Sequence, residues 1–227
     1  MKSTELASLD REIIACRFCP RLVEHREEVA RQKRRAYVDW DYWGKPLPGF
    51  GDARARLLVI GLAPGAHGAN RTGRVFTGDR SGLWLYRALH RAGLANRPTS
   101  EHRDDGLELK DCYITLAARC VPPQNKLMRE EIDRCRPFLY REHGILTRVK
   151  VVLALGHVAF ASAVDLIEYV HSTTLRPKPK FAHGAVFELG DGRPRLVGSY
   201  HPSQQNTSTG RLTEAMFDEA ITKALPG

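Results

Sequence analysis

The chain has 227 residues, of which 42% are hydrophobic. This is enough for one sizeable core and too little for two independent large domains. Lys and Arg number 35 against 26 Asp and Glu, and the resulting formal net charge of +9 attracts polyanions such as phosphate backbones.

The N-terminal segment, through about Phe50, differs in character from the rest of the chain. Its first fifteen residues mix acidic with apolar side chains and lack the unbroken apolar stretch of a secretory signal. Elsewhere, the longest apolar run is residues 151–164. It is shorter than the ~18 residues of a membrane span and is interrupted by Gly156 and His157. We therefore expect a cytosolic, monomeric protein without a membrane partner.

Five cysteines are present, and in a reducing compartment thiols indicate metal ligation or burial rather than disulfides. Cys16 and Cys19 have two residues between them, a spacing typical of iron–sulfur and zinc sites. Cys120 and Cys135 are more widely spaced than the repeated pairs of zinc ribbons, which favours an iron–sulfur cluster. Spacing alone leaves zinc and unligated thiols open. Cys112 lies in an alternating apolar segment and is expected to be an ordinary core residue.

Apolar runs of strand length alternate with helix-period stretches through the rest of the chain. In chain order, they predict a strand at 57–62, a helix at 83–92 that ends at Gly93, strands at 112–117 and 149–155, a helix at 158–170 and a strand at 196–200. Such alternation requires crossover connections. It therefore predicts a mostly parallel sheet with helices on both faces.

An unusual segment follows each predicted strand. The first strand runs into a glycine-rich loop, the second is followed by Asn125, the third by Gly156 and His157, and the last by His201. Ligands of parallel sheets bind beyond the carboxyl ends of the strands, so these segments are expected to form one site.

The glycine-rich segment, residues 61–74, matches neither the dinucleotide-binding fingerprint nor the P-loop. A nucleotide cofactor is therefore disfavoured. Glycines let the backbone approach a ligand closely, and the exposed N–H groups can bind an anion or the edge of a base.

Four features together resemble family 5 of the uracil-DNA glycosylases, also called type B. They are the sequence GLAPG at 61–65, RVFTGD at 74–79, the four spaced cysteines, and HPSQQN at 201–206. The resemblance extends from Cys16 to the helix after Arg211. It implies an α/β fold, a three-layer α/β/α sandwich around a central four-stranded, mainly parallel sheet.

The resemblance also implies the domain organisation and a cofactor. Residues 1–227 would form a single domain, with residues 1–50 as an N-terminal extension tied in by the metal site. Cys16, Cys19, Cys120 and Cys135 would hold a 4Fe-4S cluster. Its role would be structural, because removal of a base by water transfers no electrons.

The implied activity is hydrolysis of the N-glycosidic bond of uracil, and of other deaminated bases such as hypoxanthine, in DNA, leaving an abasic site. The alternative is a non-catalytic iron–sulfur protein that binds nucleic acid or transfers electrons. That alternative accounts for the charge and the cysteines. It does not account for the position of Asp79, Asn125 and His201 near strand ends.

Two residues are predicted to be catalytic. Related families carry a carboxylate in the first motif, where this chain has Leu62 and Ala63, so the resemblance assigns that work to Asp79. Asp79 would orient water or stabilise the sugar cation, and it is equally placed to cap the following helix, a compatible role. His201 would stabilise negative charge on the departing base.

The remaining predicted site residues bind the substrate. Phe76 would stack on an extruded base and Asn125 would read its edge through a donor and an acceptor. Gly61, with Leu62 and Ala63, would line the pocket, and Asn206 would help to shape it. Candidate phosphate contacts, which are equally consistent with solvated surface charge, are Arg71, Arg74, Arg80 and the basic run 31–35.

Overall fold

The structure is a computed structural model that describes residues 4–227. Residues 1–3, the start of the stretch inspected for a secretory signal, lie outside the described residues. Within 4–227, no helix is both long enough and apolar enough to cross a lipid bilayer.

Residues 4–227 contain one sheet of six strands in the order β1-β3-β2-β4-β6-β5. Its four central, parallel strands are β2 (Leu57–Gly61), β3 (Cys112–Leu116), β4 (Val151–Leu155) and β6 (Arg195–Ser199). The two-residue strands β1 (Phe50–Gly51) and β5 (Val186–Phe187) pair antiparallel at the two edges. The predicted α/β fold with four central parallel strands is confirmed, within a mixed sheet that has six strands. The edge strands are an addition, because two residues are too few to show a period in the sequence.

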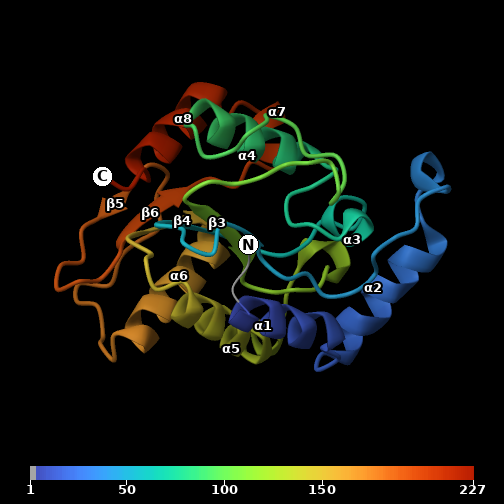
Figure 1. Cartoon of the computed structure of the whole chain (residues 1–227), viewed down its shortest axis with the longest axis horizontal. Coiled ribbons are helices and arrows are strands. Elements are labelled where there is room, and N and C mark those ends of the chain that lie inside the picture. The colour runs from blue at the N-terminus through green and yellow to red at the C-terminus, as the bar shows by residue number, and fades with distance from the viewer. Residues whose placement is uncertain (1–3) are drawn as a thin grey trace.

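Helices cover both faces of this sheet. They are α1 (Thr4–Ala15), α2 (Pro20–Gln32), α3 (Ala69–Thr72), α4 (Arg80–Arg91), α5 (Arg129–Ile145), α6 (His157–Val170), α7 (Gln204–Ser208) and α8 (Glu214–Lys223), with short 3-10 turns at Arg35–Tyr37 and Pro123–Asn125. Figure 1 shows α4 and α8 on one side of the sheet and α1, α5 and α6 on the other. The predicted three-layer sandwich is confirmed.

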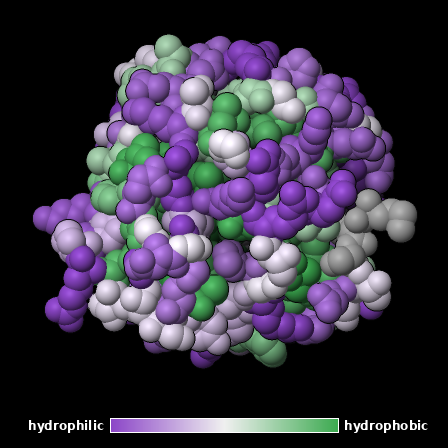
Figure 2. Space-filling view, turned by 60° about the vertical axis from the view of Figure 1, so that its left-hand side comes forward, coloured by the Kyte–Doolittle hydropathy of each residue, from purple (hydrophilic) through white to green (hydrophobic). Residues whose placement is uncertain are grey.

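The central strands face a separate core on each side. In β2, Leu57 and Val59 pack in the core beneath α4 and α8, whereas Leu58 and Ile60 pack in the core with α6. Successive side chains of a strand point to opposite faces, so burial on both faces requires an uninterrupted apolar run. This explains why the strands were recognisable from the sequence. Hydrophilic side chains cover most of the outer surface seen in Figure 2, with small apolar areas between them.

The connections of β2 and β4 set the position of the site. The chain leaves β2 and crosses over through α4, whereas it leaves the adjacent β4 and crosses over through α6 on the opposite face. Adjacent parallel strands whose crossovers diverge leave a crevice beyond their carboxyl ends. The glycine-rich loop begins at this point.

Candidate active site

One cavity of about 530 Å³ opens beyond the carboxyl ends of the parallel strands. Its walls come from four separate segments of the chain: the loop after β2, the segment leading into α4, the region after β3, and the turn after β6. The lining includes six of the predicted site residues, namely Leu62, Ala63, Phe76, Asp79, Asn125 and His201. Three of the four segments that follow the predicted strands therefore line this cavity. Gly156 and His157, which follow β4, do not line it.

The other two predicted site residues lie behind the wall rather than in it. Gly61 ends β2, and a Cβ atom at this position would lie 2.7 Å from Cε2 and Cζ of Phe76. Asn206 donates a hydrogen bond of 2.8 Å from Nδ2 to the backbone oxygen of His201. Gly61 therefore makes room for the Phe76 ring, and Asn206 fixes the turn that carries His201.

Phe76 has an unusual backbone conformation. Its φ of 51° lies in the left-handed region, which bulky side chains rarely adopt and which accumulates at functional sites. The preceding residue is fixed, because the buried hydroxyl of Tyr86 donates a 2.9 Å hydrogen bond to the Val75 oxygen. The Phe76 ring thus lies over Gly61 at the cavity wall, stacked on His201 with 5.8 Å between ring centroids and an interplanar angle of 30°.

Asp79 is the N-cap of α4, as the alternative interpretation predicts. Its Oδ1 accepts a 2.9 Å hydrogen bond from the backbone nitrogen of Gly82. A Cβ atom on Gly65 would lie 2.9 Å from its Oδ2, and one on Gly68 would lie closer still. Burial raises the pKa of Asp79, an effect opposed by the N–H groups of Gly82 and Ser81 and by the charge of Arg71. The carboxyl is thus both a cap and a desolvated group in the cavity wall.

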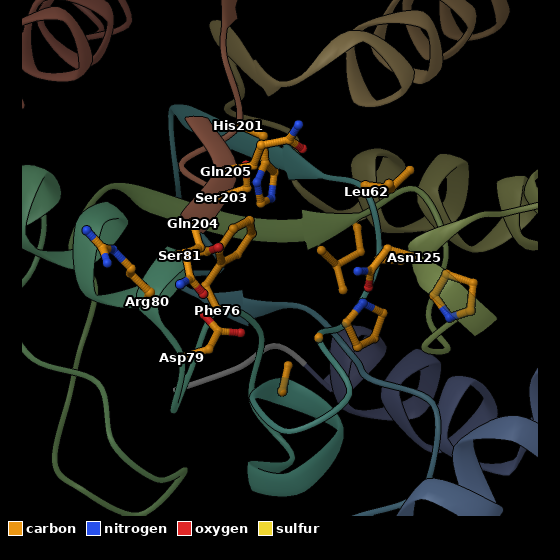
Figure 3. Close-up of a pocket in the computed structure, with 16 residues that line it drawn as sticks. Leu62, Phe76, Asp79, Arg80, Ser81, Asn125, His201, Ser203, Gln204 and Gln205 are labelled. Atoms are coloured by element: carbon orange, nitrogen blue, oxygen red, sulfur yellow. The ribbon is translucent and has the colours of Figure 1, made fainter. Parts of the chain in front are cut away.

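His201 lies across the cavity from the glycine-rich loop. Burial lowers its pKa to about 4, so its imidazole is neutral at neutral pH. A neutral imidazole offers one N–H donor and one acceptor nitrogen. Figure 3 shows Phe76, Asp79 and His201 on one side of the cavity and Leu62 and Asn125 on the other.

Asn125 is exposed at the mouth of the cavity. Its φ is 58°, and that of the preceding Gln124 is 53°, so two successive residues adopt the left-handed conformation at the end of a short 3-10 turn. Asn tolerates this conformation better than most residues, because its short side chain can hydrogen-bond locally. The turn brings the amide to face Phe76 and His201 across the cavity.

Further lining residues were not predicted. They are Pro64, Gly65, Ala69, Ser81, Leu116, Pro122, Ser203, Gln204 and Gln205, and Arg80, which was predicted only as a phosphate contact, lines the cavity as well. Most belong to the same recognised motifs as the predicted residues, so the motif boundaries in the sequence contained the information needed to include them.

The candidate phosphate contacts divide into two groups. Arg71 and Arg74 are each only 4% exposed, so neither is a solvated surface charge. Arg74 forms an ion pair of 2.7 Å with Asp105, and Arg71 donates to backbone oxygens. Arg80 is exposed, and Figure 3 shows its side chain directed away from the cavity.

The four cysteines predicted as metal ligands line a second, small cavity. Cys16 follows α1, Cys19 caps α2, Cys120 follows β3, and Cys135 lies within α5. In residues 4–227, no three or more His, Cys, Asp or Glu side chains have the arrangement of a metal site in this conformation. Cys112 is buried in the core at β3, as expected.

The surroundings of these cysteines nevertheless suit an anionic metal cluster. Arg26 donates from Nη1 to Cys120 Sγ at 3.0 Å, and the Arg119 backbone nitrogen donates to Cys135 Sγ at 3.3 Å. Both arginines line the cavity and are almost fully buried, and the Nε atom of each has no hydrogen-bond partner among the described residues. Buried cations and N–H···S contacts stabilise iron–sulfur clusters held by thiolates.

Comparison with known proteins identifies the family. Residues 48–225 match the family model described as Uracil DNA glycosylase superfamily. The chain is 51% identical to a Type-5 uracil-DNA glycosylase of Mycobacterium tuberculosis over 96% of its own length and 80% of the relative's. It is 48% identical to one of Thermus thermophilus (95% and 97%) and 43% identical to one of Pyrobaculum aerophilum (93% and 88%). The chain belongs to the uracil-DNA glycosylase superfamily and, within it, to the type-5 family that its motifs predict.

Proposed function

We propose that this protein removes uracil from DNA by hydrolysing the N-glycosidic bond, leaving an abasic site. The observation that carries the proposal is the cavity at the carboxyl edge of the sheet. It brings together a carboxylate, a neutral imidazole, an aromatic ring and an amide from separate segments of the chain. The type-5 relatives, which match almost the whole chain, carry the same activity in their names.

Binding begins when the target nucleotide is extruded from the duplex, because a base that remains stacked in the duplex cannot enter the cavity. The Phe76 ring offers a stacking surface for the base, and its position over Gly61 sets how far the base enters. Asn125, at the mouth, faces that surface and reads the edge of the base through one donor and one acceptor.

Breaking the glycosidic bond places negative charge on the leaving base and positive charge on the sugar. His201 donates an N–H to the base oxygen on which negative charge develops. Because its pKa is lowered to about 4, it acts as a neutral hydrogen-bond donor and gives up no proton to the base at neutral pH. The backbone N–H groups of the loop at Leu62 and Ala63 are further donors to this charge.

Asp79 serves the sugar side of the bond. Its carboxylate, held by the N-terminus of α4, either orients the attacking water or stabilises the positive charge on the sugar. Leu62 and Ala63, in the first motif, supply no carboxylate for either task.

We propose that the substrate range includes other deaminated bases, such as hypoxanthine. In the first motif, Leu62 and Ala63 line the cavity. Their side chains form no hydrogen bonds, so this part of the wall does not select a pyrimidine over a purine by hydrogen bonding. The volume of about 530 Å³ lies in the range of small-molecule sites and leaves room for a purine as well as a pyrimidine.

We further propose that Cys16, Cys19, Cys120 and Cys135 hold a 4Fe-4S cluster. When bound, the cluster supplies a covalent cross-link and no chemistry to the hydrolysis. The cysteines follow α1, cap α2, follow β3 and lie within α5, so their joint ligation ties the N-terminal segment to the rest of one domain. The protein then acts as a monomer on DNA in the cytosol.

A base-release assay tests the activity. Cluster-loaded protein, incubated with oligonucleotides that carry uracil, hypoxanthine or no lesion, should leave alkali-sensitive abasic sites in the first two. The affinity for DNA should fall as salt rises, since phosphate binding releases counterions. If uracil-containing DNA stays intact after long incubation with iron-loaded protein, the proposed activity is wrong, and the alternative of a non-catalytic iron–sulfur protein replaces it.

A further inference from the structure

Arg71 is a buried cation next to the candidate active site whose function neither the motifs nor the proposed mechanism explains. It lies in α3, and its side chain is 4% exposed. Among residues 4–227, no carboxylate forms an ion pair with its guanidinium at 4 Å or less. A buried charge without a paired carboxylate is costly, so its surroundings should show what retains it.

The guanidinium joins two segments that form the cavity. Nε donates a 2.7 Å hydrogen bond to the backbone oxygen of His67 in the glycine-rich loop, and Nη2 donates one of 2.9 Å to the oxygen of Gly78. Gly78 directly precedes Asp79. A Cβ atom on Gly78 would lie 2.6 Å from Arg71 Nη2, so a glycine is required for this close approach. Arg71 therefore fixes the position of the carboxylate-bearing segment relative to the loop.

The N-terminal segment holds the guanidinium in turn. The Arg71 Cζ atom lies 3.9 Å from the ring centroid of Tyr37 and 3.9 Å from that of Trp40. Two aromatic faces at this distance stabilise a cation that has lost its hydration. This contact brings residues 37–40, some thirty positions away in the sequence, to the back of the active site.

Arg71 also stands out among the charges around Asp79. Helix α4 contributes backbone N–H groups and the exposed Arg80 and Arg87. The β6–α7 turn contributes the neutral His201, and the loop contributes His67, whose pKa is lowered by burial and by nearby arginines. Arg80 and Glu101 are exposed and therefore screened by solvent. Arg71 is the charged side chain whose attraction lowers the pKa of Asp79 against the effect of burial.

We propose that Arg71 is a positioning residue for excision: held by Tyr37 and Trp40, it fixes the Asp79 segment to the glycine-rich loop and places a buried positive charge near the Asp79 carboxyl. The proposal rests on the proposed role of Asp79 in the reaction. It assigns the N-terminal segment a part in the chemistry that is separate from any metal site.

Arg74 provides a matched control. It belongs to the same loop, is equally buried, and lies 4.9 Å from the ring centroid of Phe50. It differs in being paired with Asp105. Loss of either arginine leaves buried oxygen atoms without a hydrogen-bond donor and lowers the stability of the fold. Only Arg71 is among the charges that act on the Asp79 carboxyl, so only its loss changes the electrostatic potential there.

The test is the pH dependence of single-turnover excision, with enzyme in excess over uracil-containing DNA. In Arg71→Gln, the midpoint of the acid limb should move to higher pH, and the plateau rate should fall by up to about 100-fold through misplacement of Asp79. Arg71→Lys keeps the charge and should keep the midpoint near that of the wild type at a reduced plateau. Arg74→Gln should lower the melting temperature without moving the midpoint.

A carboxyl ¹³C NMR titration of Asp79 in wild type and Arg71→Gln gives the same comparison without an activity readout. An unmoved midpoint in both measurements would reduce Arg71 to a structural residue and overturn the proposal. If Arg71→Gln does not fold, Arg71→Lys decides: a wild-type midpoint with a reduced plateau rate supports the proposal, and a wild-type plateau rate overturns it. A wild-type rate in Asp79→Asn would instead refute the proposed role of Asp79 itself.

Discussion

Asp79 has an observed role as the N-cap of α4 and a proposed role in excision, and a single substitution separates the two. Folding raises the pKa of the Asp79 carboxyl, so the folded protein favours the protonated form. The stability that this form contributes is lost as pH rises through the raised pKa, and the ionised carboxylate therefore destabilises the fold at neutral pH. Asn caps helices about as well as Asp. We therefore expect Asp79→Asn to slow single-turnover excision by about 100-fold or more while melting no lower than the wild type at pH 7.

Thermal denaturation at pH 7 and at pH 4 checks the stability half of this prediction. Any stability advantage of Asp79→Asn should shrink at the lower pH, where the wild-type carboxyl is protonated more often. An unchanged excision rate would limit Asp79 to its role as the N-cap of α4.

His201 is expected to act as a neutral donor, and its substitution should show this through the leaving group. His201→Ala removes the hydrogen bond to the departing base and should slow uracil excision by about 100-fold or more. A uracil with an electron-withdrawing substituent at C5 leaves more easily as an anion, so the same substitution should reduce its excision rate by a smaller factor. Equal losses for both bases, measured in single turnovers, would contradict stabilisation of the leaving base. The depressed pKa of about 4 also predicts no inflection from His201 between pH 5.5 and 8.

At the scale of elements, the end of β2 controls the position of the Phe76 ring. Gly61→Ala would place a Cβ atom 2.7 Å from this ring and 2.9 Å from Leu116 Cδ2, so the ring must shift. We expect a large loss of excision rate with DNA affinity nearly unchanged, because the exposed basic side chains that attract the phosphate backbone are untouched. Gly144→Ala, in helix α5 with no neighbour within 4 Å, is the control and should be neutral or stabilising. Similar excision by both variants would show that the Phe76 ring position is not critical.

The connection between the N-terminal helices and the sheet belongs to the scale of the whole molecule. If Cys16, Cys19, Cys120 and Cys135 ligate a cluster, Cys135→Ser should lose iron and lower the melting temperature, since the cross-link between segments is lost. Cys112→Ser, at a buried position in β3, should retain about four iron atoms per chain. Metal analysis and the visible absorption spectrum check this. Stoichiometric zinc without iron in native protein would overturn the cluster.

Some elements were predictable from the sequence because their pattern is local. The central strands β2 and β4 are buried on both faces and appear as unbroken apolar runs, and α6 is similarly rich in apolar residues. Helix α5 was not predicted: it contains Pro137 and many charged side chains, and buries few residues. The two-residue edge strands have no period at all.

The sequence by itself determined the family, the parallel sheet and six of the sixteen residues that line the cavity, because these depend on motifs and apolar runs that are contiguous in the chain. Only the tertiary structure decided that Gly61 supports the Phe76 ring rather than lining the cavity, and that Arg71 and Arg74 are buried. The physical reason is that both outcomes depend on contacts between distant segments. An arginine appears in a sequence as a surface charge unless its partners are known, and for Arg71 they are two aromatic rings about thirty residues away.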